Sequence, residues 1–473
     1  MTILPTRSVS TPRRPDGLPV GVGEVARAGA VRSASAVAFW LLNAFVLFLW
    51  VDGGGVSDLA NGQATTSLGR LSGLVASSLL LVQVFLMARI PALERSWGQH
   101  RLTAIHRTVG FTSFWLMAAH IATITIGYAG NDVGAVWSTL VDFVLNYAGM
   151  LLAVAGTLSL FMVVATSIRA ARRRMRYQSW HLLHLYAYLG AGLALPHQLW
   201  TGQEFLRSTT STVFWWAVYA AALVSVLVWR LGLPAWRSAR HRIRVHSVET
   251  DPSGVTTVTM HGHRVHDLRS RSGQFFQFRF LDGPGWSRAH PFSLSASPKS
   301  GSLRISAAPV GPGSRRLQNL HPGTRVLIEG PYGILHEGVR TQRKVLLMAA
   351  GIGIAPLRGL LEDMEQEPDD ITVIHRVSTS DRAALRAEVE RLTHQHGARY
   401  VVAAGPRNRH LATWLPASEH SLDPAQALLD VVPDLAAHDV YLCGSGSWMD
   451  LAQRALLDAG LPPRQLHRED FSD

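Results

Sequence analysis

The sequence predicts a multidomain membrane protein, in which a six-helix transmembrane bundle is followed by an antiparallel β-barrel domain and a Rossmann-like α/β domain. The chain has 473 residues, of which 47% are hydrophobic, so it is long enough for two or three domains. The apolar residues concentrate before about Leu233, whereas the remainder alternates short β-like runs with turns and amphipathic stretches. A membrane domain therefore precedes the soluble part of the chain.

Six apolar segments are candidate membrane spans. They cover approximately residues 36–51, 71–90, 103–129, 143–168, 180–200 and 213–233. The first could also be the core of a signal peptide behind Arg27 and Arg32, but its leader is long and further spans follow it. We therefore assign residues 34–235 to the membrane domain. Residues 1–33, which are rich in Pro, Gly and Arg, are predicted to form a disordered basic cytoplasmic tail.

Charge assigns the connecting segments to the two sides of a membrane. The connection between the fourth and fifth segments carries Arg169, Arg172, Arg173, Arg174 and Arg176, whereas residues 130–142 contain no Lys or Arg. By the positive-inside rule, both termini and the soluble domains are predicted to be cytoplasmic in a multi-pass protein of the plasma membrane. The net charge of +12 fits a lipid bilayer with an anionic surface as partner. No nucleic acid is expected, because no basic patch is interleaved with aromatic residues.

Four histidines on two of the apolar segments form pairs at matched depths. His106 and His120 lie 14 residues apart on the third segment, and His184 and His197 lie 13 apart on the fifth. At 1.5 Å per residue, each pair spans roughly 20 Å, so one histidine of each pair lies toward the cytoplasm and the other toward the outside. Imidazole is an axial haem ligand, and ionisable residues inside membranes are usually functional. The pattern predicts an inner haem held by His106 with His184 and an outer haem held by His120 with His197.

Two alternatives stay open on spacing alone. The histidines could form hydrogen bonds between helices, and His181 competes with His184 as the inner ligand. A step of 13 residues also leaves His184 and His197 about 140° out of phase on an ideal helix, although Pro196 could distort that segment.

The chain contains a single cysteine, Cys443. One thiol cannot form an intramolecular disulfide, a zinc ribbon or an iron–sulfur cluster held by four cysteines. Electron carriers in this protein are therefore expected to be haem, flavin or nicotinamide, and the soluble part is expected to face the reducing cytoplasm.

Two motifs that follow the cationic segment 237–244 suit a flavin nucleotide. Arg288-Ala289-His290-Pro291-Phe292-Ser293 follows a β-like run, and its aromatic ring and hydroxyl could stack on a flavin and hydrogen-bond near its N5 atom. The same residues would also fit an ordinary barrel strand and turn that bind no flavin. The glycine-rich turn 309–316 then leads into a short helix, where backbone N–H groups and Arg can hold a pyrophosphate. We assign residues 240–338 to this β-barrel domain.

The remaining residues, 342–473, follow an α/β pattern. Lys344 to Ala350 has the composition of a buried strand, and Gly351-Ile352-Gly353-Ile354-Ala355-Pro356 opens a helix behind it. A second strand, Asp439 to Cys443, ends at Cys443-Gly444-Ser445-Gly446. The two turns are expected at the carboxyl edge of one parallel sheet, where α/β proteins bind ligands.

The ordered set of motifs resembles the ferric reductase and NADPH oxidase superfamily, of bacterial type, over nearly all of the chain after the tail. The resemblance implies a ferric-reductase-like transmembrane haem domain fused to a part similar to ferredoxin-NADP reductase, with His184 preferred over His181. The implied flavin-binding residues are Arg288, His290, Pro291, Phe292, Ser293, Gly313 and Ser314. The implied NAD(P)H-binding residues are Gly351, Gly353, Pro356, Cys443 and Gly444. The terminal Glu469-Asp470-Phe471 resembles the family's acidic-aromatic motif, with Phe471 shielding the flavin ring. Ser293, Cys443 and Phe471 are the candidate catalytic residues.

The resemblance also implies an activity and its cofactors. The expected protein is an NAD(P)H-dependent transmembrane flavohaem reductase, which moves electrons from cytoplasmic NAD(P)H through FAD and two b-type haems to an extracytoplasmic Fe(III) chelate or dioxygen. Arg376, Arg407 and Arg409 could recognise a 2′-phosphate, which favours NADPH with NADH as the alternative. Two other functions are a haem-containing electron-relay subunit for a partner redox protein, and a membrane-tethered flavin reductase without haem. The natural acceptor, the oligomeric state and regulation stay open.

Overall fold

The computed structural model describes residues 2–3, 22–175, 177–364, 367–408, 411–419 and 421–469 of the chain. The chain divides into two compact units. One, here called the sheet unit, comprises Met1–Val31, Glu94–His100 and Leu231–Asp473. The other, here called the helical unit, comprises Arg32–Leu93 and Arg101–Arg230.

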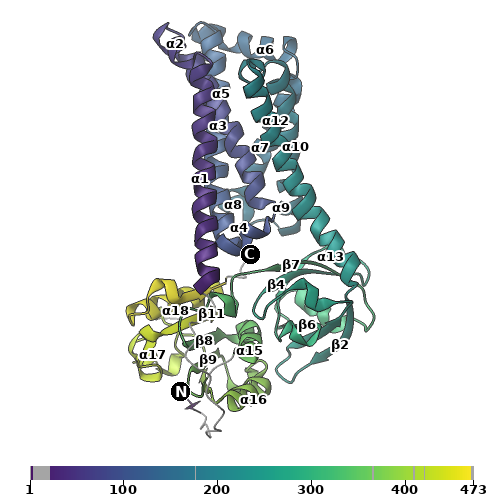
Figure 1. Cartoon of the computed structure of the whole chain (residues 1–473), viewed down its shortest axis with the longest axis vertical. Helices are drawn as coiled ribbons and strands as arrows, with labels where there is room; N and C mark the ends of the chain where they lie inside the picture. The colour runs from purple at the N-terminus through teal and green to yellow at the C-terminus, as the bar shows by residue number, and fades with distance from the viewer. Residues whose placement is uncertain are drawn as a thin grey trace. The chain divides into compact units, whose positions relative to one another are not determined.

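The helical unit consists of apolar helices, the longest of which run alongside one another (Figure 1). In chain order the helices that contribute to it are α1 (Val22–Asp52), α2 (Gly55–Ala60), α3 (Ala64–Met87), α4 (Pro91–Trp97), α5 (Gln99–Tyr128), α6 (Val136–Asn146), α7 (Met150–Ser167), α8 (Arg169–Arg172), α9 (Tyr177–His184), α10 (Tyr186–Trp200), α11 (Gln203–Leu206) and α12 (Thr209–Ser225). Large apolar side chains on their outer surfaces are exposed, including Trp40 at 70%, Leu151 at 65% and Phe161 at 60%. Such a surface is stable in lipid but not in water, which identifies a membrane protein.

Small residues and serine hydrogen bonds join these helices. Ser113 of α5 donates a hydrogen bond to the carbonyl of Ala76 in α3 at 3.1 Å. Helices α7 and α10 approach so closely that a Cβ added to Gly156 would lie 2.8 Å from the carbonyl oxygen of Gly190. Close backbone approach of this kind supplies packing energy between apolar helices in lipid, where burial of apolar surface supplies little.

The prediction of six spanning helices is corrected to five candidate spans among the described residues. These are Gly23–Asp52, Ala64–Met87, Gln99–Tyr128, Met150–Ser167 and Thr209–His241. The predicted segment 180–200 is instead broken at Leu185 into α9, of 8 residues, and α10, of 15. Because a helix rises 1.5 Å per residue, α10 is about 22 Å long, which is less than the hydrocarbon core of a bilayer.

The predicted tail also differs from the structure where it is described. Helix α1 already begins at Val22, so residues 22–33 are helical and not disordered. Thr2 and Ile3 form a short strand, β1, that pairs with Val402 and Val401. Residues 4–21 lie outside the described residues. Ala and Arg, which have high helix propensity, recur from residue 26 onward and favour the helix over the disorder that the Pro-rich beginning of the tail suggests.

The first part of the sheet unit contains two antiparallel sheets of three strands each. One has the order β2 (Arg244–Thr250), β3 (Thr256–His261), β6 (Ser302–Ala307), and the other β5 (His290–Ser293), β4 (Phe275–Phe280), β7 (Val326–Tyr332). Phe276, Phe278 and Phe280 alternate along β4 and fill the core between the sheets. A closed barrel, as predicted, is not confirmed, because in the described part of the chain the two sheets are joined by isolated bridges, such as Leu294 to Ile305, and not by a continuous ladder.

The second part of the sheet unit is an α/β domain, as predicted. Its sheet has the order β1, β10 (Arg399–Ala404), β9 (Ile371–Val377), β8 (Lys344–Ala350), β11 (His438–Cys443), β12 (Leu466–Arg468), and all its strands except β1 are parallel. Helices α15 (Ile354–Asp363), α16 (Arg386–His396), α17 (Gln426–Val431) and α18 (Gly446–Asp458) accompany it. Alternate residues of β8 enter different cores: Val345 and Leu347 pack with α15 and α16, whereas Leu346 and Met348 pack with α17 and α18. Burial on both faces explains the nearly continuous apolar composition of the strand.

Candidate cofactor sites

One pair of the predicted haem ligands faces each other in the helical unit. The rings of His106, on α5, and His184, at the end of α9, have centroids 6.0 Å apart and planes inclined at 65°. Nδ1 of His106 is buried without a hydrogen-bond partner. Nδ1 of His184 lies 3.3 Å from the hydroxyl of Ser167, which also accepts a hydrogen bond from Trp180. The ring that faces His106 is therefore His184, and its orientation is supported by neighbouring polar and aromatic groups.

The second pair consists of His120 on α5 and His197 on α10. His120 Nδ1 lies 2.8 Å from the carbonyl oxygen of Gly69. Because a carbonyl only accepts hydrogen bonds, Nδ1 carries the hydrogen, and Nε2 keeps its lone pair for a metal. A Cβ on Gly73 would lie 2.5 Å from His120 Nδ1, so this glycine makes room for the ring. Nδ1 of His197 is buried without a partner.

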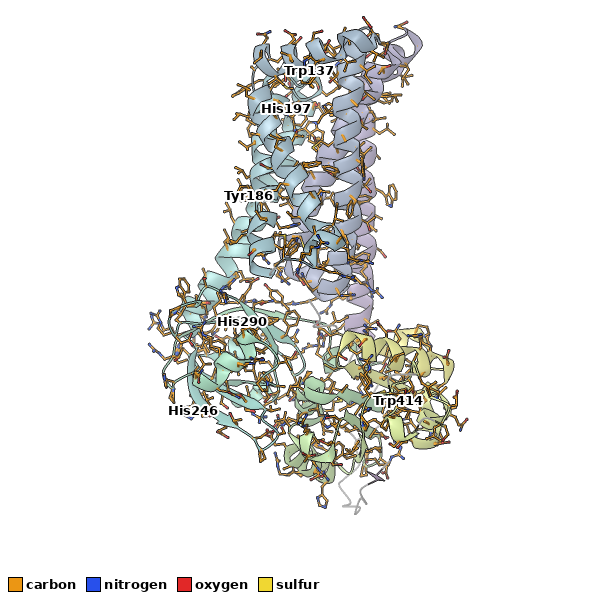
Figure 2. The ribbon with its side chains drawn as sticks, turned by 180° about the vertical axis from the view of Figure 1, so that it is seen from behind. Trp137, Tyr186, His197, His246, His290 and Trp414 are labelled. Carbon is orange, nitrogen blue, oxygen red and sulfur yellow. The ribbon has the colours of Figure 1, made fainter. Side chains whose placement is uncertain are left out.

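The two pairs lie at different levels of the helical unit. Figure 2 shows His197 near the end of the helical unit that carries Trp137. Tyr186, which is two residues after His184 in the sequence, lies farther from that end. The side chains fit haem ligation on two counts. Buried imidazole nitrogens without a hydrogen-bond partner are costly unless another group binds them, and the ring of His120 is oriented as a ligating histidine requires.

The two flavin motifs meet in the sheet unit. His290, labelled in Figure 2, begins β5, and a Cβ on Gly313 would lie 2.5 Å from its Nδ1. Gly313 belongs to α14 (Pro312–Arg316), whose Ser314 hydroxyl accepts a hydrogen bond from the backbone N–H of Gly311 at 3.1 Å. Glycine is therefore needed where the loop crosses the imidazole. The contact brings the predicted ring-binding and pyrophosphate-binding motifs together.

The surroundings of this contact are electropositive. Burial lowers the pKa of His290, and the charges of Arg316 and Arg288 lower it further. Arg316 is itself held by Asp282, to which its Nε donates at 2.8 Å. Positive charge of this kind suits the phosphates of a flavin nucleotide. Ser293, at the end of β5, is half-buried and pairs with Phe275 of β4.

The predicted dinucleotide loops also come together, at the carboxyl ends of β8 and β11. Gly351 has a φ of +54°, in the left-handed region that favours glycine. A Cβ on Gly353 would overlap the carbonyl oxygen of Cys443 and lie 2.9 Å from the nitrogen of Gly444. The turn before α15 and the turn before α18 are therefore in backbone contact. Pro356 is buried in the first turn of α15.

Of the candidate catalytic residues, Cys443 lies within the described part of the chain and Phe471 does not. The Cys443 side chain is only 2% exposed, so its thiol does not line an open surface. Phe471 and the preceding Asp470 lie outside the described residues. Glu469, just before them, is buried against Gly333, and burial raises its pKa to about 8. Glu469 has no predicted role beyond its place in the acidic-aromatic motif, and two adjacent acidic residues, Glu469 and Asp470, are the sequence signal at this position.

Arg376, a predicted candidate for 2′-phosphate recognition, is bonded within the chain. Its guanidinium donates hydrogen bonds to the carbonyls of Gly405 at 2.8 Å and Pro406 at 3.0 Å, and the residue is 8% exposed. It thus ties the end of β9 to the loop after β10, and these carbonyls occupy hydrogen-bond donors that a 2′-phosphate would otherwise use. Arg407 is exposed, and Arg409 lies outside the described residues.

We expect the Arg376→Met protein to lose about 2 kcal/mol of unfolding free energy, because the carbonyls of Gly405 and Pro406 lose the hydrogen-bond donor that a buried guanidinium supplies. The ratio of kcat/KM for NADPH over NADH should stay unchanged. Chemical denaturation and steady-state kinetics measure the two quantities. Arg407→Met is the matched control, since an exposed guanidinium at that edge is available to a 2′-phosphate. A loss of NADPH preference in the Arg376 variant alone would contradict the structural role.

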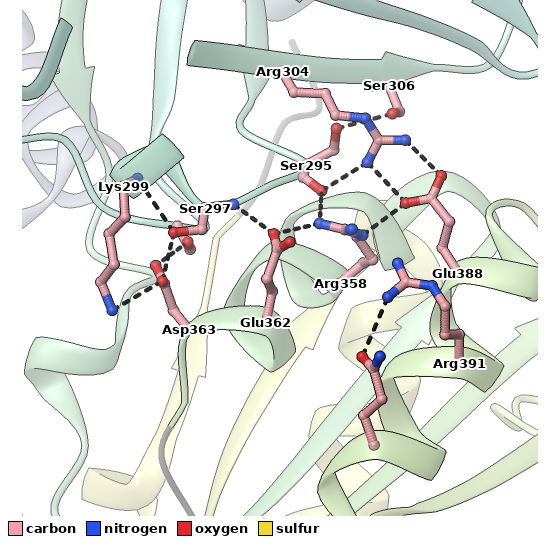
Figure 3. Close-up of polar contacts among 12 residues, drawn as sticks. Ser295, Ser297, Lys299, Arg304, Ser306, Arg358, Glu362, Asp363, Glu388 and Arg391 are labelled. Carbon is pink, nitrogen blue, oxygen red and sulfur yellow. Dashed lines mark hydrogen bonds and ion pairs between the residues drawn. The ribbon is translucent and has the colours of Figure 1, made fainter. Parts of the chain in front are cut away.

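Charged residues join the two parts of the sheet unit (Figure 3). Glu388 of α16 forms ion pairs with Arg304 of β6 at 2.6 Å and with Arg358 of α15 at 2.9 Å. Arg358 is 5% exposed and also donates a hydrogen bond to the carbonyl of Ser295 at 3.1 Å. Because these pairs are partly buried, salt screens them less than surface pairs. They hold the flavin-type and dinucleotide-type motifs in one arrangement.

Comparison with known proteins agrees with this division. Residues 72–195 match the family described as ferric reductase like transmembrane component, and residues 347–454 match the oxidoreductase NAD-binding domain. The first range includes His106, His120 and His184 and ends just before His197.

Similar proteins include a flavohemoprotein of Bacillus subtilis, 27% identical over 206 residues, which are 42% of this chain and 51% of that protein. Dual oxidase 2 of Sus scrofa is 28% identical over 137 residues, 27% of this chain and 9% of that protein. The solved flavohem-like FAD/NAD binding domain of nitric oxide dioxygenase from Vibrio cholerae is 22% identical, with 50% of this chain and 100% of that chain covered and a TM-score of 0.39. The chain spans about half the length of the flavohemoprotein that it matches.

Proposed function

We propose, on the premise that this chain belongs to the ferric reductase and NADPH oxidase superfamily, that it moves electrons across a membrane from NAD(P)H to an acceptor on the other side. The chain is a membrane oxidoreductase with a ferric-reductase-type domain and an FAD/NAD(P)H-binding domain. The proposed carriers are FAD and two b-type haems. The observation that carries the proposal is the facing pair His106 and His184, with a buried imidazole nitrogen that has no hydrogen-bond partner.

A bound flavin would accept a hydride from NAD(P)H and release single electrons, and haem iron would carry those electrons one at a time. The chain's own residues bind and orient these groups. Arg288 and Arg316 supply positive charge for the flavin phosphates, the neutral imidazole of His290 offers a hydrogen-bonding group beside them, and Ser293 offers a hydroxyl to the ring. Gly353 and Gly444 allow the backbone to approach a dinucleotide.

The histidines have distinct supporting groups. The hydroxyl of Ser167 and the ring of Trp180 restrain His184, whereas the carbonyl of Gly69 fixes the tautomer of His120. His106 with His184 are the proposed inner ligands, and His120 with His197 the outer ligands. The arginines of the segment 169–174 support a cytoplasmic side for the inner pair, by the positive-inside rule.

An Fe(III) chelate or dioxygen is the proposed acceptor. The test uses the full-length protein supplied with haem and FAD and given NADPH without oxygen. We expect a Soret band, flavin absorbance in stoichiometric amount, and reduction of both chromophores after NADPH is added. Rapid reduction of a ferric chelate would then identify a metalloreductase, whereas superoxide formed on admission of air, and removed by superoxide dismutase, would identify an oxidase.

Three other results would overturn parts of the proposal. Well-folded protein without a Soret band would indicate a membrane-tethered flavin reductase. Haem without bound flavin, and without NADPH oxidation, would indicate an electron-relay subunit that depends on a partner protein. Reduction of flavin with no reduction of haem would contradict transfer across the membrane unit.

A further inference from the structure

A buried histidine contacts the dinucleotide turn from the strand beside it. His375 lies on β9, in register with Ala349 of β8, and is fully buried. Its Nε2 lies 2.9 Å from the carbonyl oxygen of Gly351, and its Nδ1 lies 3.0 Å from the hydroxyl of Tyr400 on β10. Neither the predicted set of site residues nor the motifs of the sequence include His375 or Tyr400.

The directions of both hydrogen bonds follow from chemistry. Burial lowers the pKa of His375 to about 4, so the imidazole is neutral near pH 7 and carries a single N–H. The carbonyl of Gly351 only accepts, so the hydrogen is on Nε2. Nδ1 then accepts from the Tyr400 hydroxyl, whose pKa burial raises well above its usual value, so the hydroxyl keeps its hydrogen. Tyr400 therefore selects the tautomer of His375 that can hold Gly351.

The carbonyl that His375 holds belongs to a turn whose backbone conformation is restricted. Gly351 has a φ of +54°, and two residues later Gly353 is in close contact with the backbone of Cys443 and Gly444. The turn is thus fixed on one side by β11 and on the other by the imidazole. Without the imidazole, the half-buried Gly351 carbonyl would keep only the hydrogen bond from the backbone N–H of Ile354, which lies within the turn itself.

We propose that His375 is a positioning residue for NAD(P)H binding, which holds the turn 351–353 in the shape that receives the dinucleotide phosphates, with Tyr400 fixing its tautomer. This inference rests on the proposed function to the extent that NAD(P)H binds at this turn. It does not depend on haem or on transfer across the membrane.

The test compares two substitutions at one buried position. In His375→Leu the imidazole donor is lost and the Gly351 carbonyl keeps only the hydrogen bond from the backbone N–H of Ile354. We expect the KM for NAD(P)H to rise about tenfold, with little change in the rate of flavin reduction at saturation. In His375→Gln the amide nitrogen can replace Nε2 as donor, so the KM should stay near that of the wild-type protein. Tyr400→Phe should give a rise of about threefold, because the tautomer is no longer selected.

A matched control separates positioning from stability. His438 is 2% exposed and lies on β11 of the same sheet, but at its amino end, away from the turn. His438→Leu should lower the melting temperature without changing the KM for NAD(P)H. Anaerobic flavin reduction in the full-length, FAD-loaded protein is the kinetic measurement, with FAD content and melting temperature recorded for each variant.

The outcomes are distinct. An unchanged KM in a folded His375→Leu protein would overturn the inference alone. Equal losses in His375→Leu and His375→Gln would also overturn it, since they would show that packing and not the donor matters. A wild-type protein that binds neither NADPH nor NADH would overturn the inference together with the proposed function, whereas absence of haem reduction would affect only the latter.

Discussion

The His184→Ala protein is expected to bind about half the haem of the wild-type protein, because one of two sites loses an axial ligand. Electron transfer to the acceptor should be lost, while NAD(P)H still reduces FAD. His184 is the ring that faces His106, and Ser167 and Trp180 hold it in place. The ratio of haem to FAD, together with reduced-minus-oxidised spectra, measures the effect.

His181→Ala is the matched control, since both histidines lie on the short helix α9. That variant should keep both haems and most of its activity. Full haem content in His184→Ala together with loss in His181→Ala would reverse the assignment. Full haem content in both would contradict ligation by this helix and leave these histidines as groups that connect helices.

The Gly353→Ala protein is expected to oxidise NAD(P)H about 100-fold more slowly, the loss that a displacement of about 1 Å at a binding site can cause. The added Cβ would overlap the carbonyl oxygen of Cys443, and backbone atoms cannot move aside as a flexible side chain does. The turn or the end of β11 must shift. Haem and FAD contents should stay normal, because neither group is proposed to bind there.

Gly351→Ala in the same turn distinguishes a clash from strain. Nothing lies within 4 Å of a Cβ on Gly351, but its φ of +54° costs a non-glycine residue about 1 kcal/mol. We expect a loss of less than about tenfold for this variant. Steady-state NAD(P)H oxidation and circular dichroism of both proteins make the comparison. Equal losses in the two variants would mean that the close approach to Cys443 is unimportant.

Several features of this protein could be read from local sequence. The apolar character of the segments before Leu233 predicts membrane helices, and the doubly buried strands Lys344–Ala350 and Asp439–Cys443 predict a parallel sheet with turns at one edge. The glycines of those turns follow from the same logic, since only glycine permits the backbone contact that the structure contains. Hydrophobic periodicity and glycine content are properties of neighbouring residues, so these predictions needed no knowledge of distant contacts.

Other features depended on contacts between distant residues. Leu185 breaks the predicted fifth span, and residues 22–33 continue a helix that the composition of the tail does not indicate. From the sequence, Arg376 is expected to be a solvent-exposed cation. In the structure, its guanidinium donates hydrogen bonds to carbonyls of a loop about 30 residues away.

The sequence by itself determined the class of protein, the paired histidines and the two glycine turns, because spacing and composition express them directly. Only the tertiary structure decided that His184 faces His106, that Gly313 lies against His290, and that His375 holds Gly351. Each of these is a contact between residues brought together by packing. The physical reason is that the contact partner of a side chain depends on the whole fold. The periodicity and polarity of a segment, by contrast, depend only on residues that are close together in the sequence.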